Sequence, residues 1–306
     1  MGGRPPVRYT RSMMPPAHAG LRGRAAPWAL ALLLGGLALL LASLACTPSL
    51  DLTGDLGRAY ADLAADPLAT HPHPVPGRIF TAAVSWLVGL RGADVVWTML
   101  AACLLLPVLI ARWALRRGHC PGEALLVATA VSATLVVRTT LHYGGYPDAV
   151  TYLGLLAVWL LRRRPVAVTI AWLLTVLDHE RALLMLPWAL VMVGGWGEDP
   201  APEARAQRRR AWFGLLLATV AATALHLGLE ARRVAEHDAE SYLAPLLARP
   251  LRNLQTYGIA RPVVGLASAF QWVWLVPAVW AMTRLRSGRW RPVVAQFGLP
   301  LLAVVP

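Results

Sequence analysis

Hydrophobic residues follow one another along this chain in long blocks rather than in the one-sided stripes of amphipathic helices. A helix needs about 20 apolar residues to cross roughly 30 Å of lipid hydrocarbon. The blocks therefore predict an all-α fold, a polytopic transmembrane helical bundle with about nine membrane segments. We expect these segments at residues 27–46, 93–113, 121–141, 147–161, 165–177, 182–196, 211–229, 263–283 and 292–306.

The segments around and between the blocks differ in character. Residues 1–26 are rich in Pro, Gly and Arg, which predicts a disordered basic tail ahead of a transmembrane domain over 27–306. The stretch FTAAVSWLVGL is too short to cross a membrane and predicts an interfacial helix within a first outer loop, residues 47–92. A second outer loop is expected at 230–262. Because the chain stops within an apolar block, we expect its C-terminus to be truncated.

The composition agrees with a membrane protein, since 57% of the residues are hydrophobic and only 15% are charged. The net charge of +13 raises nucleic acid as a partner. However, the arginines form short clusters between apolar blocks, which is the arrangement that the positive-inside rule describes. A cytoplasmic N-terminus places 19 of the 29 basic residues inside. We therefore expect no nucleic-acid partner, and an integral protein of the bacterial inner membrane whose active face is extracytoplasmic.

The stretch LDHERALLMLP, residues 177–187, places four ionisable residues between two apolar arms. A single helix over 165–197 would be about 50 Å long and would move the later arginine clusters to the outer side, so we expect the chain to turn at DHER. Both arms are short, which predicts a turn below the outer membrane surface. Charges at that depth cost about 2.5–3.5 kcal/mol each unless they are paired or hydrated. They would either hold the hairpin together or bind a substrate.

Further polar groups are expected on the same outer side. Asp51 and Asp55 of DLTGD are one helical turn apart, and a carboxylate there can act as a general base on an acceptor hydroxyl. Arginines bind phosphate through charge-assisted hydrogen bonds. Snorkelling would also explain Arg138, and Asp148 would also complement a helix dipole. The candidate catalytic residues are Asp51 and Asp55; the candidate substrate-binding residues are Arg78, Arg138, His142, Asp148, Asp178, His179, Glu180 and Arg181.

Metal or cofactor binding is not indicated by the sequence. The two histidines of HPHPVP alternate with prolines, which is typical of an extended loop and is weak evidence for zinc. No nucleophile motif such as GxSxG, a P-loop or HExxH is present. We therefore predict no cofactor, with a divalent metal possible but not indicated.

Three stretches resemble the GT-C superfamily of polytopic glycosyltransferases: PVPGRIFTAAVSWLVGL, GGYPDAVTYLGLLAVWLL and LDHERALLMLPWALVM. The resemblance implies an inverting transfer from a polyprenyl-phosphate-linked sugar to a glycan, lipid or protein acceptor, among membrane lipids. It also implies Asp51 or Asp55 as the base, with Arg138, His179 and Arg181 near the departing phosphate and Glu180 orienting Arg181. The superfamily's first-loop acids are usually adjacent or one residue apart, whereas DLTGD separates them by three residues.

Two other interpretations of the same residues stay open. The DHER residues and Arg138 would form an ion or substrate relay in a transporter or flippase-like carrier. Alternatively, the chain would be a membrane scaffold without chemistry. A carrier would move a substrate without forming a new glycosidic bond, which separates it from a transferase.

Overall fold

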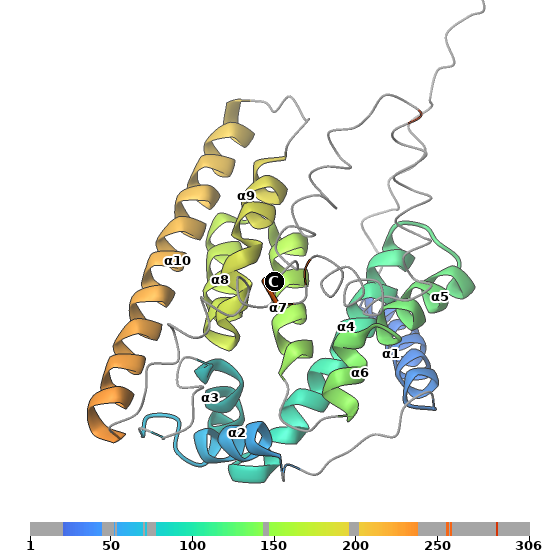
Figure 1. Ribbon diagram of the computed structural model, residues 1–306. Helices are drawn as coiled ribbons and strands as arrows, with labels where there is room; N and C mark the ends of the chain where they lie inside the picture. The colour runs from blue at the N-terminus through green and yellow to red at the C-terminus, as the bar shows by residue number, and fades with distance from the viewer. Residues whose placement is uncertain are drawn as a thin grey trace, which may run out of the picture.

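A computed structural model describes residues 21–44, 52, 54–69, 71, 78–142, 147–195, 202–237, 255, 256, 258 and 286. Every regular element in these ranges is a helix, which confirms the predicted all-α class (Figure 1). The elements are α1 (Leu21–Leu44), α2 (Asp55–Ala65), α3 (Ile79–Leu87), η1 (Gly92–Asp94), α4 (Val95–Arg116), α5 (Pro121–Ser132), α6 (Leu135–His142), α7 (Asp148–Leu161), α8 (Pro165–Asp178), η2 (Glu180–Met185), α9 (Leu186–Gly194) and α10 (Pro202–His237).

Three of the described helices are long and apolar enough to cross a membrane. They cover Ala26–Leu44 in α1, Gly92–Arg116 in η1 and α4, and Pro202–Glu236 in α10. The predicted segments 263–283 and 292–306 lie outside the described residues. The structure thus shows membrane-type helices, and the number of nine crossings stays a prediction.

Two predicted segments are interrupted in the structure. The segment 121–141 is divided between α5 and α6, because the Thr134 hydroxyl donates to the carbonyl of Val131 at 2.6 Å and the helix ends there. The segment 182–196 begins as the 3-10 helix η2 and becomes α-helical only at α9. Pro187 stands in the first turn of α9. A proline there lacks the N–H that would continue an earlier α-helix and is favoured at a helix start.

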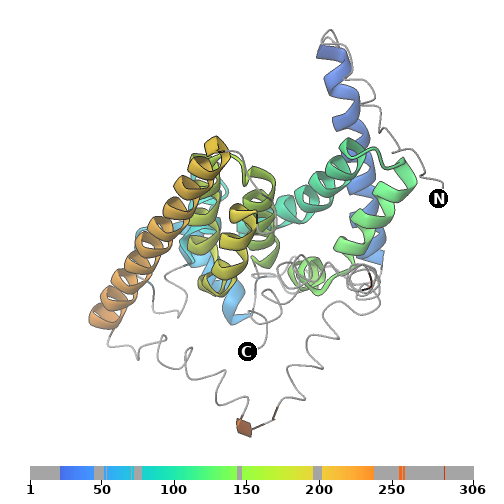
Figure 2. The same ribbon diagram turned by 90° about the horizontal axis from the view of Figure 1, so that it is seen from above.

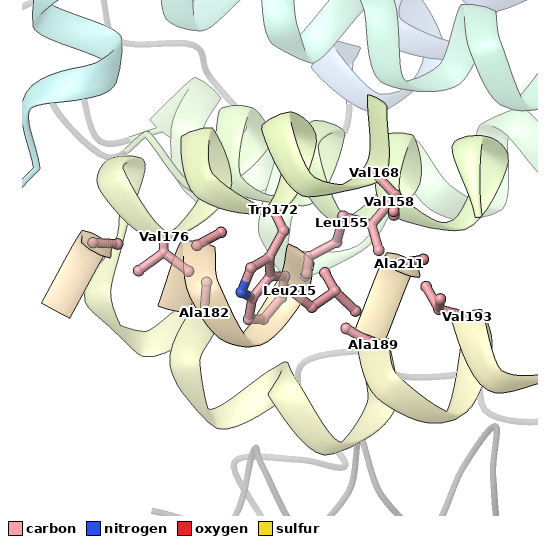
Figure 3. Close-up of a cluster of buried hydrophobic side chains, with 12 residues drawn as sticks. Leu155, Val158, Val168, Trp172, Val176, Ala182, Ala189, Val193, Ala211 and Leu215 are labelled. Atoms are coloured by element: carbon pink, nitrogen blue, oxygen red, sulfur yellow. The ribbon is translucent and has the colours of Figure 1, made fainter. Parts of the chain in front are cut away.

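Helices α7 to α10 pack around the fully buried Trp172 of α8 (Figure 3). The indole Nε1 of Trp172 donates to the Thr219 hydroxyl of α10 at 2.8 Å. Gly154 of α7 lies against the Thr175 side chain of α8, so that a Cβ at this glycine would overlap it. Such small residues let apolar helices approach closely. Figure 2 shows this group on one side of the molecule and α1 with α5 on the other.

The chain reverses between α8 and α9, as the sequence predicted for DHER. The carbonyl of Val176, near the end of α8, lies 2.9 Å from Nε2 of His226 in α10. The carbonyl of Gly194, at the end of α9, accepts from Nη1 of Arg208 near the start of α10, also at 2.9 Å. Because α8 and α9 end at opposite parts of the same long helix, the two run in opposite directions. The DHER turn, residues 178–181, is the bend between them.

Candidate functional site

The two short helices of the first loop, α2 and α3, lie at the end of the α7–α10 group where the DHER turn is found (Figure 1). Arg78 precedes the first residue of α3 and reaches Glu180 in η2, 102 residues further along the chain. Its Nε donates to Glu180 Oε2 at 2.8 Å and its Nη2 donates to Oε1 at 2.6 Å. This bidentate geometry is the strongest that an arginine and a carboxylate form. The pair attaches the first loop to the turn.

Asp178 makes a second attachment between the loop and the helices. Its side chain is fully buried. One carboxylate oxygen accepts from the Thr81 hydroxyl of α3, and the other accepts from the Thr151 hydroxyl of α7 at 2.6 Å. Ser85, one turn after Thr81, donates to the Thr81 carbonyl at 2.8 Å. Asp178 therefore joins α3, α7 and α8. Burial raises the pKa of its carboxyl to about 7, and the two threonine hydrogen bonds oppose this rise only in part.

Glu180 is charged because of its arginine partner. Burial alone would raise the pKa of this carboxyl, but the hydrogen bonds and the positive charge of Arg78 outweigh burial and hold the pKa at about 2. Tyr60 of α2 is fully buried beside Arg78. Burial raises the pKa of the Tyr60 phenol far above its usual range, and the charge of Arg78 opposes that rise. Both residues thus keep one protonation state at neutral pH, with Glu180 charged and Tyr60 neutral.

His179 is neutral in this environment. Its side chain is buried, and its Nδ1 accepts a hydrogen bond from the backbone N–H of Arg181 at 3.2 Å. Burial, reinforced by the charge of Arg78, lowers the pKa of His179 to about 3. The imidazole therefore brings no positive charge to the turn.

Arg181 takes a different position from the other DHER residues. Its side chain is exposed, and within the described part of the chain it makes no hydrogen bond or ion pair. The expectation that Glu180 orients Arg181 is wrong, since Glu180 binds Arg78 instead. Successive side chains of the 3-10 helix η2 point about 120° apart, so the two neighbours face different directions. Glu180 consequently faces the first loop while Arg181 faces outward.

The other candidate residues lie on α2, α6 and α7, apart from Asp51. Asp148 begins α7, is partly buried, and lies within electrostatic reach of both Arg78 and Arg181. Asp55 begins α2 and lies five residues before Tyr60, while Arg138 and His142 belong to α6. The side chains of these three lie outside the described residues, as does Asp51 altogether. Arg78, Asp148, Asp178, His179 and Glu180 are thus brought together, with Arg181 beside them.

Three residues of this cluster were not predicted from the sequence: Tyr60, Thr81 and Thr151. The other buried residues of α2 and α7 are apolar or glycine, so Tyr60 and Thr151 resemble ordinary core positions. Thr81 shares the buried face of α3 with Ser85 and Ala82. The spacing of polar residues could have identified the two threonines. Thr81 and Ser85 are spaced i,i+4, and Asp148 and Thr151 are spaced i,i+3. Such spacings place polar groups on one helix face.

A second buried ion pair lies further along α10. Glu230 and Arg233 are both buried, and the Arg233 Nε and Nη2 donate to the two carboxylate oxygens at 3.0 and 2.9 Å. His226, one turn before Glu230, binds the carbonyl of Val176 next to the DHER turn. Among the described residues, no three His, Cys, Asp or Glu side chains gather closely enough to hold a metal ion.

No protein-family model, curated protein sequence or solved structure matches this chain.

Proposed function

We propose that this protein is a membrane glycosyltransferase that moves a sugar from a polyprenyl-phosphate donor to an extracytoplasmic hydroxyl acceptor. The proposal includes nine membrane segments, a cytoplasmic N-terminus and a place in a bacterial inner membrane. One observation carries it: the first-loop helices α2 and α3 are attached to the DHER turn by Arg78–Glu180 and Thr81–Asp178. The loop that holds the candidate base is therefore built against the turn that holds a free arginine.

The distances along α2 support a shared site. Asp55 precedes Tyr60 by five residues, which is about 7.5 Å along a helix axis. Tyr60 in turn lies beside Arg78. The first turn of α2 therefore starts about one and a half helical turns before Tyr60, the residue that lies beside Arg78. Asp51 lies four residues earlier in the sequence.

The contacts divide the candidate residues into two groups. Arg78, Asp178 and Glu180 have their polar atoms engaged with each other or with threonines, so we assign them to positioning of the loop. Arg181 is exposed and is free to bind a phosphate. Arg138, His142 and Asp148 stay candidates for substrate contacts, and neutral His179 would contribute at most a hydrogen bond.

The chemical step follows from these roles. Asp51 or Asp55 takes the proton of the acceptor hydroxyl, whose oxygen attacks the anomeric carbon of the donor sugar. The bond from this carbon to the phosphate oxygen breaks, and the polyprenyl phosphate leaves with the bonding electron pair. Arg181 stabilises the negative charge on the departing phosphate. Attack opposite the leaving group inverts the anomeric centre.

The test compares acid variants in membranes that contain the full chain. A panel of radiolabelled polyprenyl-phosphate sugars would be supplied, and glycan product and residual lipid-linked sugar would be measured. We expect Asp51→Asn or Asp55→Asn to lower transfer at least about 100-fold, and Arg181→Gln to lower it by a similar factor. Asp94→Asn is the matched control, because Asp94 is an exposed acid of the same outer region without a side-chain capping bond.

Two results would contradict the proposal. Wild-type transfer by both Asp51→Asn and Asp55→Asn would exclude the assigned base. Movement of the sugar lipid across the membrane without any new glycosidic bond would indicate a carrier instead.

A further inference from the structure

The last turn of α4, the turn after it and the turn after α7 bring six arginines together, at the opposite end of α7 from the DHER turn. The rings of Trp113 and Trp159, near the ends of these helices, have centroids 5.1 Å apart, so the two turns are neighbours. The arginines are Arg112, Arg116, Arg117, Arg162, Arg163 and Arg164.

Three of these arginines lie over tryptophan rings. Arg112 lies over Trp28 of α1 at 3.0 Å from guanidinium carbon to ring centroid. Arg117 lies over Trp113 at 5.7 Å, and Arg162 lies over Trp159 at 5.6 Å. We call the six arginines, together with Trp28, Trp113 and Trp159, the arginine–tryptophan patch. Stacking on a ring uses the face of a guanidinium, so that the N–H groups at its edge can donate to other partners. Nη1 of Arg162 donates in this way to the carbonyl of Trp159 at 2.9 Å.

The turns that follow α4 and α7 contain no acidic residue. Four arginines of the patch are exposed: Arg116, Arg117, Arg163 and Arg164. The nearest acid beyond the α4 turn is Glu123, whose carboxylate binds His119 Nδ1 at 3.2 Å and the backbone N–H of Cys120 at 3.1 Å. In the described part of the chain, Nη1 of Arg112 is buried and has no hydrogen-bond partner.

We infer that the arginine–tryptophan patch binds a phosphate-bearing anion, either the headgroup of an anionic lipid or free phosphate. Arginine matches a phosphate with paired N–H donors, and stacking on tryptophan fixes the guanidinium planes. The patch lies at the ends of the long apolar helices α1 and α4. Tryptophan and arginine at such helix ends are found at the level of lipid headgroups. The inference is independent of the proposed glycosyl transfer.

The test uses the purified full chain in detergent, titrated with phosphatidylglycerol and followed by native mass spectrometry. Phosphatidylcholine serves as a zwitterionic lipid and inorganic phosphate as a competitor. We expect Arg117→Gln/Arg162→Gln to lower phosphatidylglycerol binding by about tenfold. Arg209→Gln/Arg210→Gln is the matched control, because it removes the same charge from exposed arginines near the start of α10. Its binding is expected to stay within about twofold of wild type.

A second pair of substitutions separates shape from charge. Arg117→Lys/Arg162→Lys keeps both charges but loses the planar donors, and we expect about a threefold fall in binding. Circular dichroism and elution volume would verify that each variant is folded. Loss of bound phosphatidylglycerol on adding inorganic phosphate identifies free phosphate as the ligand, and its retention identifies the lipid. Equal losses in patch and control variants, wild-type binding by the Lys pair, or no binding of either anion would overturn the inference.

Discussion

The Arg78–Glu180 pair is almost shielded from solvent, with 8% and 15% of the two side chains exposed. Removing one partner of such a pair leaves a buried charge without its counter-ion. We expect Arg78→Met to lower the free energy of unfolding by about 3–5 kcal/mol, and Arg78→Met/Glu180→Leu to recover most of that loss. Tryptophan fluorescence during denaturant unfolding in detergent would measure both values.

The control for this comparison is another ion pair of the same chain. Arg232 and Glu236 form a 2.6 Å pair on α10 with 54% and 41% of their side chains exposed. Arg232→Met should change the unfolding free energy by no more than about 1 kcal/mol. A double variant Arg78→Met/Glu180→Leu that is no more stable than Arg78→Met would contradict the account of Arg78 and Glu180.

His179 gives a stability effect that depends on pH. Its pKa falls from 6.5 to about 3 on folding, so below pH 6.5 the unfolded chain binds a proton that the folded chain does not. The stability is therefore complete above pH 6.5 and is lost as the pH falls toward 3. Glu180, lowered from 4.5 to about 2, acts in the same direction only below about pH 4.5.

Asp178 acts in the opposite direction between pH 6.5 and 4.5, because burial raises the pKa of its carboxyl to about 7 and the folded chain binds the proton more readily. Only a comparison of variants therefore isolates the histidine in this window. We expect His179→Asn to remove the histidine's share of the loss in melting temperature as the pH falls, so that the variant loses less on acidification than the wild type. The asparagine oxygen can still accept from the Arg181 N–H. His119→Asn, which replaces an exposed histidine, should leave the dependence unchanged. An unchanged slope for His179→Asn would show that the imidazole does not carry the effect.

At the scale of elements, close approach between α7 and α8 depends on one glycine. A Cβ at Gly154 would overlap the Thr175 side chain, whereas a Cβ at Gly36 of α1 would meet nothing within 4 Å. We expect Gly154→Ala to destabilise the protein by about 1–3 kcal/mol through overpacking. Gly36→Ala should be neutral or up to about 1 kcal/mol stabilising. Melting temperatures of the two variants in one detergent would contradict this if their order were reversed.

The ends of elements show what sequence patterns can predict here. The apolar block 211–229 predicted a membrane segment, and the helix α10 continues beyond it on both sides. Arginines at these ends stop an apolar run but favour continued helix. The break between α5 and α6 was not predicted, because it depends on a threonine hydroxyl rather than on proline or glycine. Block patterns therefore report membrane character more directly than helix boundaries.

At the scale of the whole molecule, topology was more predictable than partner choice. Arm length and arginine placement were enough to predict the reversal at DHER, because these are properties of single segments. The partner of Glu180 was not predictable, since Arg78 is 102 residues away and Arg181 is its neighbour in sequence. Tyr60, Thr81 and Thr151 were missed for the same reason: their roles exist only after three separate helices meet.

This separation of 102 residues has a consequence for biosynthesis. Translation at roughly 5–20 residues per second places Glu180 in the nascent chain about 5–20 s after Arg78. During that time α4 to α8 are synthesised while the first loop still lacks its anchor. Closing so long a loop has a high entropic cost, and only the completed hairpin provides the contacts that offset it. The order of chain synthesis thus makes assembly of the candidate site a late event in the folding of this protein.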